Sequence, residues 1–507
     1  MSGESFLLLR RREVLAGLAA AGLVPQSALA LAGSLSLRAL FDRAAAAREP
    51  GRMLAILRAF DAGRLNRDDS VIYAMVVRGV ERDEALRAAF PFGKADGSSP
   101  YVVSQRHGAY LDLQGKPATA DIAARLDQET ERLRAEASRG IAPPSFVLDA
   151  VLEVERSMFA AGRSPDAGAA LARQIAELER LRKAASPAPG VWRLPGGGEY
   201  YRLRLGCTTA SDITPAELDR QVAAETGALL ARADRLLKSL GLTRGTVGAR
   251  LRALKERRDY LYTPDDNGRA KAIADMNAAL DRLRPHLPTW FNPPFEPQSS
   301  VKRMSPADER AAKRGYRNAP TAMRPGAYYP DLSMVHDRPA WTLTTVAYHE
   351  TIPGHLLQLG RQAMADPHPL QVRYAGGYSE GWAIYAEGLA DRIGLLSPMD
   401  QLGFLQSLLF RFARVTADIG IHLRRWDRTR ALRYLQETVG FELFFPFAVE
   451  VDRYAAEPAG FAGDALAALA LRHKAPVTPA AARNFHDGVL NRGPLSTEAI
   501  ARLLSHP

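Results

Sequence analysis

The sequence predicts a mostly α-helical protein built around a large core. Apolar residues make up 47% and charged residues 24% of the chain, and these ordinary globular values exclude a mainly disordered protein. Apolar side chains recur every three to four residues in long stretches, which is the spacing of one buried helix face. Segments rich in proline and glycine separate these stretches. With 507 residues, the chain is long enough for two or three domains.

Residues 1–30 have the order of an export signal. Arg10, Arg11 and Arg12 precede an apolar stretch over 16–24, and the small residues of 28–30 follow. The paired arginines resemble a twin-arginine signal. We therefore interpret residues 1–30 as a twin-arginine signal peptide, and expect a periplasmic protein that meets the membrane only through this segment. An uncleaved N-terminal anchor is the alternative.

Charge and cysteine content exclude two other classes of protein. The net charge is +11, but the basic residues are spread along the chain and do not alternate with aromatic residues, so we expect no nucleic-acid binding. Cys207 is the one cysteine, which excludes an internal disulfide and a zinc finger built on cysteines.

Two helical regions follow the signal. Helical spacing continues to residue 185, where a segment rich in proline and glycine begins. We place the boundary there, between an N-terminal helical region, 31–190, and a helical catalytic region, 191–507. In the second region the proline-rich segment 287–297 interrupts the helices, and Arg324–Tyr329 is expected to form a short β element. We expect this element to be the edge strand along which a peptide lies.

The segment from His349 to His355 indicates a metal site. Two histidines that flank Glu350 offer neutral imidazoles as ligands and a carboxylate that can act on a water. The histidines are six residues apart, which places them on different faces of a regular helix. Pro353 cannot donate to the helix ladder, and Gly354 tolerates unusual dihedral angles, so a broken turn can bring the rings together. A kinked structural helix without metal is the alternative.

Glu380 favours the metal site over that alternative. It lies 25 residues beyond His355, and a carboxylate from a second helix is what a site with two histidines needs as third ligand. Glu387 lies seven residues further, on nearly the same helical face, and we expect it to hold a ligand histidine or to serve as another ligand. Two solvated surface carboxylates are the alternative.

A polar stripe runs along the otherwise apolar helix predicted over 408–423. Arg411, Arg414, Asp418 and His422 recur at three-to-four spacing, and buried polar groups are costly unless they are paired or functional. We expect the stripe to face the active site, with a structural row of ion pairs as the alternative.

These segments resemble the bacterial family catalogued as domain of unknown function 885. The resemblance extends over most of the mature chain and is carried by His349–Gln358, Gly377–Tyr385, Asp418–His422, Glu450–Tyr454 and Phe485–Asp487. It implies a zinc metallopeptidase of the gluzincin type, with a helical, oligopeptidase-like body around a deep cleft. It further implies that His349, His355 and Glu380 bind the metal and that Glu350 is the general base.

The chain departs from this family after Tyr454. The family usually has Pro-Gly-Gln-Ala followed by Tyr, whereas this chain has Pro458-Ala-Gly-Phe461 and then Asp464. The missing side chains are of the type that donates to an oxyanion. His422 and Tyr454 then remain as candidate catalytic donors. The remaining candidates for support of the metal or contact with substrate are Glu387, Asp418, Arg414 and Tyr328.

Our first hypothesis is therefore an exported zinc-dependent hydrolase, a metallopeptidase that cleaves short peptides with a metal-activated water and Glu350 as general base. Two alternatives remain. One is a metal-dependent amidase or esterase that acts on a non-peptide substrate. The other is a catalytically weak, peptide-binding pseudoenzyme, which the altered segment 458–464 favours. Two histidines and a glutamate suit zinc best, although manganese, cobalt or iron also bind such ligands.

Overall fold

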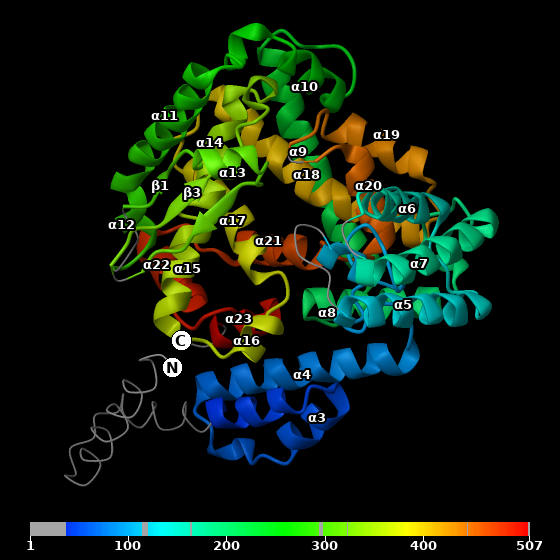
Figure 1. Ribbon diagram of the computed structural model, residues 1–507. Helices are drawn as coiled ribbons and strands as arrows, with labels where there is room; N and C mark the ends of the chain where they lie inside the picture. The colour runs from blue at the N-terminus through cyan, green and yellow to red at the C-terminus, as the bar shows by residue number, and fades with distance from the viewer. Residues whose placement is uncertain are drawn as a thin grey trace.

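The computed structural model describes residues 37–113, 120–162, 165–293, 298–321, 323–443 and 445–504. The predicted signal peptide, residues 1–30, lies outside the described residues. The described chain is mostly helical with one small sheet, which confirms the predicted fold class (Figure 1). The predicted deep cleft stays a prediction. Among the described helices, none is both long and apolar enough to cross a membrane.

The N-terminal helices pack into two separate groups. A first helix, 37–46, shares a hydrophobic cluster with the next two helices and with Leu370 and Tyr374 from much later in the chain. The three helices that follow form their own cluster, which includes Leu126, Leu148 and Leu178, and Figure 1 shows them beside the main body. The bounds of these helices are α3 (Pro50–Arg58), α4 (Arg67–Ala89), α5 (Ala120–Ser138), α6 (Ser145–Ala160) and α7 (Pro165–Ala184).

The main body surrounds one long buried helix, α18 (Pro398–Leu423). Ser397 caps its first turn by accepting from the amide of Asp400, and nearly every side chain from Leu402 to His422 is buried. The other helices of the body are α8 (Gly197–Thr209), α9 (Pro215–Ser239), α10 (Val247–Lys255), α11 (Asp266–Leu283), α12 (Leu287–Trp290), α13 (Pro306–Arg310), α14 (Ala340–Glu350), α15 (His355–Ala365), α16 (Pro369–Arg373), α17 (Tyr378–Arg392), α19 (Arg428–Thr438), α20 (Phe447–Ala456), α21 (Ala462–Lys474), α22 (Pro479–Leu490) and α23 (Thr497–Leu504).

A three-stranded sheet lies beside α14 and α15 (Figure 1). Its strands, β1 (Ser300–Val301), β2 (Tyr316–Asn318) and β3 (Ala327–Tyr329), have the order β1-β3-β2. Strand β3 therefore pairs on both sides, and the prediction that Arg324–Tyr329 forms an edge strand is wrong. Strand order depends on contacts between distant segments, which the local sequence pattern does not contain.

The register identifies which main-chain groups face the outer edge of β2. Tyr328 is opposite Arg317, and the carbonyl of Tyr328 accepts from the amide of Lys302 beyond β1, at 2.8 Å. Both main-chain groups of Tyr328 thus point to β1, so its pair with Arg317 is the type without hydrogen bonds. The amide and carbonyl of Arg317 consequently point away from the sheet, to its outer edge.

The helix that carries His349 breaks before His355, as the sequence predicts. Helix α14 ends at Glu350 and α15 begins at His355. Between them the amide of Gly354 donates to the carbonyl of Tyr348 at 3.0 Å, six residues back rather than four. A Cβ atom at Gly354 would lie 2.1 Å from the carbonyl oxygen of His349, closer than any real contact. This position therefore requires glycine.

We expect Gly354→Ala to lower the free energy of unfolding by at least about 2 kcal/mol, because the added methyl group meets main chain that cannot move aside. Chemical denaturation measures this change. The matched control is Gly227→Ala in the middle of α9, where a Cβ has nothing within 4 Å. There alanine should stabilise the protein by about 0.5–1 kcal/mol. Equal stability of the Gly354 variant and the native protein would contradict the close approach.

Candidate metal centre

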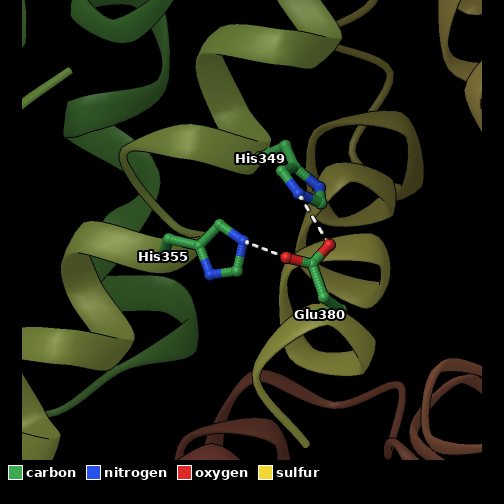
Figure 2. Close-up of side chains that lie close together, drawn as sticks. All are labelled: His349, His355 and Glu380. Carbon is green, nitrogen blue, oxygen red and sulfur yellow. Dashed lines mark ion pairs between the residues drawn. The ribbon is translucent and has the colours of Figure 1, made fainter. Parts of the chain in front are cut away.

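His349, His355 and Glu380 converge from three helices. Figure 2 shows both imidazole rings directed at the Glu380 carboxylate, which lies in the first turn of α17. His349 Nε2 lies 3.5 Å from one carboxylate oxygen, and His355 Nε2 lies 3.3 Å from the other. The three candidate ligand atoms all lie within 4.8 Å of one another. The break between α14 and α15 thus brings together the residues that the sequence predicts as ligands.

The spacing and chemistry of these atoms fit a tetrahedral zinc ion. Two ligands at ~2.0–2.1 Å from a tetrahedral centre lie about 3.3 Å apart, close to both nitrogen–oxygen distances. His355 Nε2 is buried, and no acceptor or donor among the described residues is aligned to form a hydrogen bond with it, although a Glu380 oxygen lies 3.3 Å away. A buried nitrogen of this kind is costly unless another group binds it. Two imidazoles and a carboxylate therefore form a donor set that fits zinc.

Glu387 fixes the orientation of His349. Its carboxylate lies 2.8 Å from His349 Nδ1, and the Glu387 side chain is 1% exposed. Because a carboxylate only accepts, Nδ1 carries a proton and Nε2 is the nitrogen directed at the centre. A metal bound there would displace the proton that Nε2 holds in the charged ring. Of the two roles considered for Glu387, this contact matches support of a ligand histidine rather than direct ligation.

Burial and hydrogen bonds perturb the pKa values of all three candidate ligands. Burial lowers the pKa of His355, so this ring is neutral at neutral pH and able to ligate. Burial opposes the charged form of His349, but hydrogen bonds to Glu380 and Glu387 outweigh it and raise the pKa of His349 to about 9. Burial likewise opposes ionisation of Glu380, yet the two histidines hold the pKa of Glu380 well below its usual range. Glu380 is thus an ionised ligand throughout the physiological range.

The polar stripe of α18 divides between two places. Arg411 lies at the candidate centre, with its guanidinium 3.4 Å from both Glu380 Oε2 and His349 Nε2. One turn further, Arg414 donates to Asp464 at 3.1 Å. Asp418 instead accepts from the Tyr201 hydroxyl at 2.6 Å, within the core. The stripe thus reaches the candidate centre at Arg411, and the predicted roles of Arg414 and Asp418 at the site stay predictions.

His422 and Tyr454 are engaged in the core. The amide of Val191 donates to His422 Nδ1, and His422 Nε2 donates to the carbonyl of Tyr454 at 3.0 Å. The Tyr454 hydroxyl donates to Glu450 at 3.2 Å, and burial raises the pKa of Tyr454 well above its usual value. His422 also lies three turns of α18 beyond Arg411, about 16 Å along the helix axis. These contacts do not support the expectation that either residue donates to an oxyanion.

Glu350 has an unexpected partner in Arg317. The guanidinium of Arg317, on β2, donates to Glu350 Oε2, and the two side chains are 30% and 16% exposed. The sequence pattern did not single out Arg317, because the contact joins residues 33 positions apart and Arg317 belongs to no motif. Tyr328, opposite Arg317 on β3, is buried, and burial followed by the charge of Glu350 raises the pKa of Tyr328. Tyr328 thus lies within electrostatic range of Glu350, and its predicted role at the site stays a prediction.

The altered segment after Tyr454 also reaches the site. The Arg414 guanidinium carbon lies 4.0 Å from the centre of the Phe461 ring, and the same guanidinium holds Asp464. Burial, opposed by the charge of Arg414 and reinforced by that of Glu380, raises the pKa of Asp464 to about 6. Asp464 thus lies within electrostatic range of a candidate ligand, but it is paired.

His486, in the motif Phe485–Asp487, belongs to the core rather than to the candidate centre. Its Nδ1 lies 2.8 Å from the carbonyl of Trp290 and must donate, so Nε2 accepts from the Tyr385 hydroxyl at 2.6 Å. This arrangement requires a neutral ring, and burial lowers the pKa of His486 to about 4.

The pKa of His486 predicts a pH dependence of stability. An unfolded histidine titrates near 6.5, so between pH 6.5 and 4 the unfolded state binds more protons, and stability falls as the pH falls. The expected contribution is about 1.4 kcal/mol per pH unit, or about 3 kcal/mol in all. His486→Gln should therefore give a shallower fall of unfolding free energy between pH 6.5 and 4 than the native protein. If the unfolding free energies of the two proteins fell in parallel with pH, this account would be contradicted, even if the variant were less stable at every pH.

Fold and site together define a helical protein with a candidate metal centre of two histidines and one glutamate. The model of the family described as bacterial proteins of unknown function (DUF885) matches residues 21–504, and the chain belongs to this family. The membership predicted from the motifs is thus confirmed, whereas the likeness to gluzincins stays a prediction. No protein with a curated description matches the chain.

Two solved structures are similar to the chain in fold. One is named a "putative lipoprotein" from Colwellia psychrerythraea and is 24% identical, with 90% of each chain covered and a TM-score of 0.70. Another, a "putative lipoprotein of unknown function" from Shewanella oneidensis, is 14% identical, with 90% of this chain and 91% of that chain covered and a TM-score of 0.63.

Proposed function

We propose that this protein is an exported zinc-dependent hydrolase of the metallopeptidase type that cleaves short peptides. The observation that carries the proposal is the convergence of His349, His355 and Glu380 at distances suited to zinc, with Glu350 next in the chain to a ligand. The contact of Glu387 with His349 adds the outer support that zinc-binding histidines usually have.

The residues around the centre have complementary roles in amide hydrolysis. Bound zinc supplies the Lewis acidity that lets water attack an amide at neutral pH. His349, His355 and Glu380 would hold the ion, and Glu350 would accept a proton from the attacking water and pass it to the departing amine. Arg411, which contacts both His349 and Glu380, supplies positive charge near the oxygen that becomes negative.

The outer edge of β2 supports a peptide as substrate. The amide and carbonyl of Arg317 point to that edge, and no hydrogen bond to either group is found within the described part of the chain. An extended peptide could pair with these groups as an added strand. A peptide paired there would lie near Glu350, which Arg317 contacts through its side chain.

Export is supported by residues 1–30 and by the name "putative lipoprotein" of both similar structures. Replacing Arg11 and Arg12 with lysine should leave the protein in the cytoplasm, because the arginine pair is the feature that the twin-arginine machinery reads. Cell fractionation measures this, and normal export of the variant would reject that route.

A second candidate function is peptide binding without turnover. Two observations favour it: Arg317 occupies one oxygen of Glu350, and Asp464 takes the place of a residue type that would donate to an oxyanion. Under this alternative the protein binds zinc and peptides but does not cleave them.

The experiment that tests the proposal compares metal content with hydrolysis on a library of short peptides. The purified protein should contain one zinc per chain, lose hydrolysis on treatment with a chelator, and regain it on addition of one equivalent of zinc. Hydrolysis that is indifferent to the chelator would reject the zinc mechanism. One zinc per chain without hydrolysis of any peptide would favour the binding protein.

A further inference from the structure

The contact between Arg317 and Glu350 raises a question about the working state of the site. A general base must accept a proton through an oxygen lone pair. One oxygen of Glu350, Oε2, instead accepts from the guanidinium of Arg317. The pair is only partly exposed, so it is protected from the solvent that weakens surface ion pairs. While this bond lasts, one lone pair of Oε2 is occupied by the guanidinium.

Arg317 is suited to bind a carboxylate other than that of Glu350. A guanidinium offers five donors in a planar fork that matches a carboxylate, and here a single nitrogen, Nη1, binds Glu350. The side chain is 30% exposed, so an incoming group can reach it. Its partner Glu350 is next in the chain to the candidate ligand His349, so the guanidinium lies near the candidate metal centre.

The position of Arg317 limits which carboxylate can reach it. The reacting carbonyl must lie about 3 Å from the attacking water, and that water about 3 Å from Glu350. A guanidinium nitrogen that is hydrogen-bonded to the same oxygen of Glu350 is therefore within about 9 Å of that carbonyl. Since an extended chain spans about 3.5 Å per residue, a C-terminal carboxylate one or two residues beyond the scissile bond falls in this range.

We propose that Arg317 binds the C-terminal carboxylate of the substrate and, by doing so, releases Glu350 to act as general base. This inference rests on the proposed function and defines its substrate class: peptides with a free C-terminus, from which one or two residues are removed. Without a peptide, Arg317 stays bound to Glu350; when a peptide with a free C-terminus binds, Arg317 pairs with its carboxylate instead.

The test measures binding rather than turnover. The probes are two non-cleavable analogues of acetyl-Ala-Ala in which a CH2–CH2 link replaces the amide between the two alanines. One probe has a free carboxylate at the C-terminus, and the other has a carboxamide. Calorimetric titration of the zinc-loaded full chain should show the free acid binding at least about 10-fold more tightly than the carboxamide, the usual strength of a charge-assisted pair.

Three variants separate binding by Arg317 from a purely structural role. Arg317→Gln should reduce the preference for the free acid to within about 3-fold and leave the carboxamide nearly unaffected. Glu350→Gln removes the competing carboxylate, so it should tighten binding of the free acid about 5- to 10-fold in the native background and not in the Arg317→Gln background. The matched control, Arg314→Gln, removes an exposed arginine three residues away and should change neither affinity.

Any of three results would overturn the inference. The native protein could bind the two probes with equal affinity, it could show no measurable binding of the free acid, or Arg317→Gln could keep the preference unchanged. If Arg317→Gln fails to fold, Arg317→Lys keeps the charge but loses the planar fork, and it should retain part of the preference. If the native protein hydrolysed no peptide, the proposed function would be rejected. The affinities of the two probes could still be measured and compared, so the two failures are distinguishable.

Discussion

Glu350→Gln should abolish most peptide hydrolysis while one zinc per chain remains bound. Glutamine has nearly the same shape as glutamate but cannot take a proton from water, and loss of a general base typically costs ~10²–10⁴ in turnover. Zinc should remain because Glu350 is not among the atoms that converge on the centre. Steady-state hydrolysis of a short peptide and metal analysis of the same sample measure the two effects.

The matched control for this substitution is Glu309→Gln. Glu309 is also paired with an arginine, Arg303, at 2.7 Å, but it lies on the surface helix α13. Its substitution should change neither turnover nor zinc content. Turnover within a factor of about three of the native value in the Glu350 variant would show that another residue accepts the proton.

Glu380→Gln should weaken zinc binding itself, and hydrolysis should fall with it. Glu380 supplies the negative charge of the ligand set, and it faces both candidate histidines at 3.3–3.5 Å. Loss of a supporting residue around a metal typically costs 10–100-fold in affinity, so loss of a charged ligand should cost at least about 100-fold. Competition with a zinc chelator of known affinity measures this change.

Glu387→Gln provides the comparison within the same helix. Glu387 contacts His349 Nδ1 rather than the centre, so its substitution should weaken zinc only about 10- to 100-fold. The account requires Glu380→Gln to weaken zinc binding more than Glu387→Gln does. The opposite order would indicate that Glu387 is the ligand and Glu380 the supporting residue.

The helical fold and the ligand set were predictable because both depend on local patterns. Apolar spacing predicts helices without knowledge of their partners, and Pro353-Gly354 predicts a break wherever it interrupts such spacing. That break accounts for two histidines six residues apart with ring centres 4.8 Å apart in the structure. Glu380 was predicted instead from the need for a carboxylate as third ligand, and Glu387 from its spacing of seven residues, which places it on the same face of α17.

The remaining features depend on contacts across the chain, which local patterns do not contain. Arg317 lies in a short strand between polar loops, and only the pairing of β2 with β3 brings it to Glu350. Pairing also places β3 in the middle of the sheet. His422 and Tyr454 were predicted as donors from their chemistry alone. In the structure His422 binds the amide of Val191 and the carbonyl of Tyr454, and the Tyr454 hydroxyl binds Glu450.

The central claim is that His349, His355 and Glu380 bind one zinc ion. Anomalous diffraction from crystals of the zinc-loaded protein, recorded on both sides of the zinc absorption edge, tests it most directly. We predict one strong zinc peak, at ~2.0–2.2 Å from His349 Nε2, His355 Nε2 and a carboxylate oxygen of Glu380. A zinc peak at another set of residues, or none at these three in a protein that binds zinc, would contradict the account.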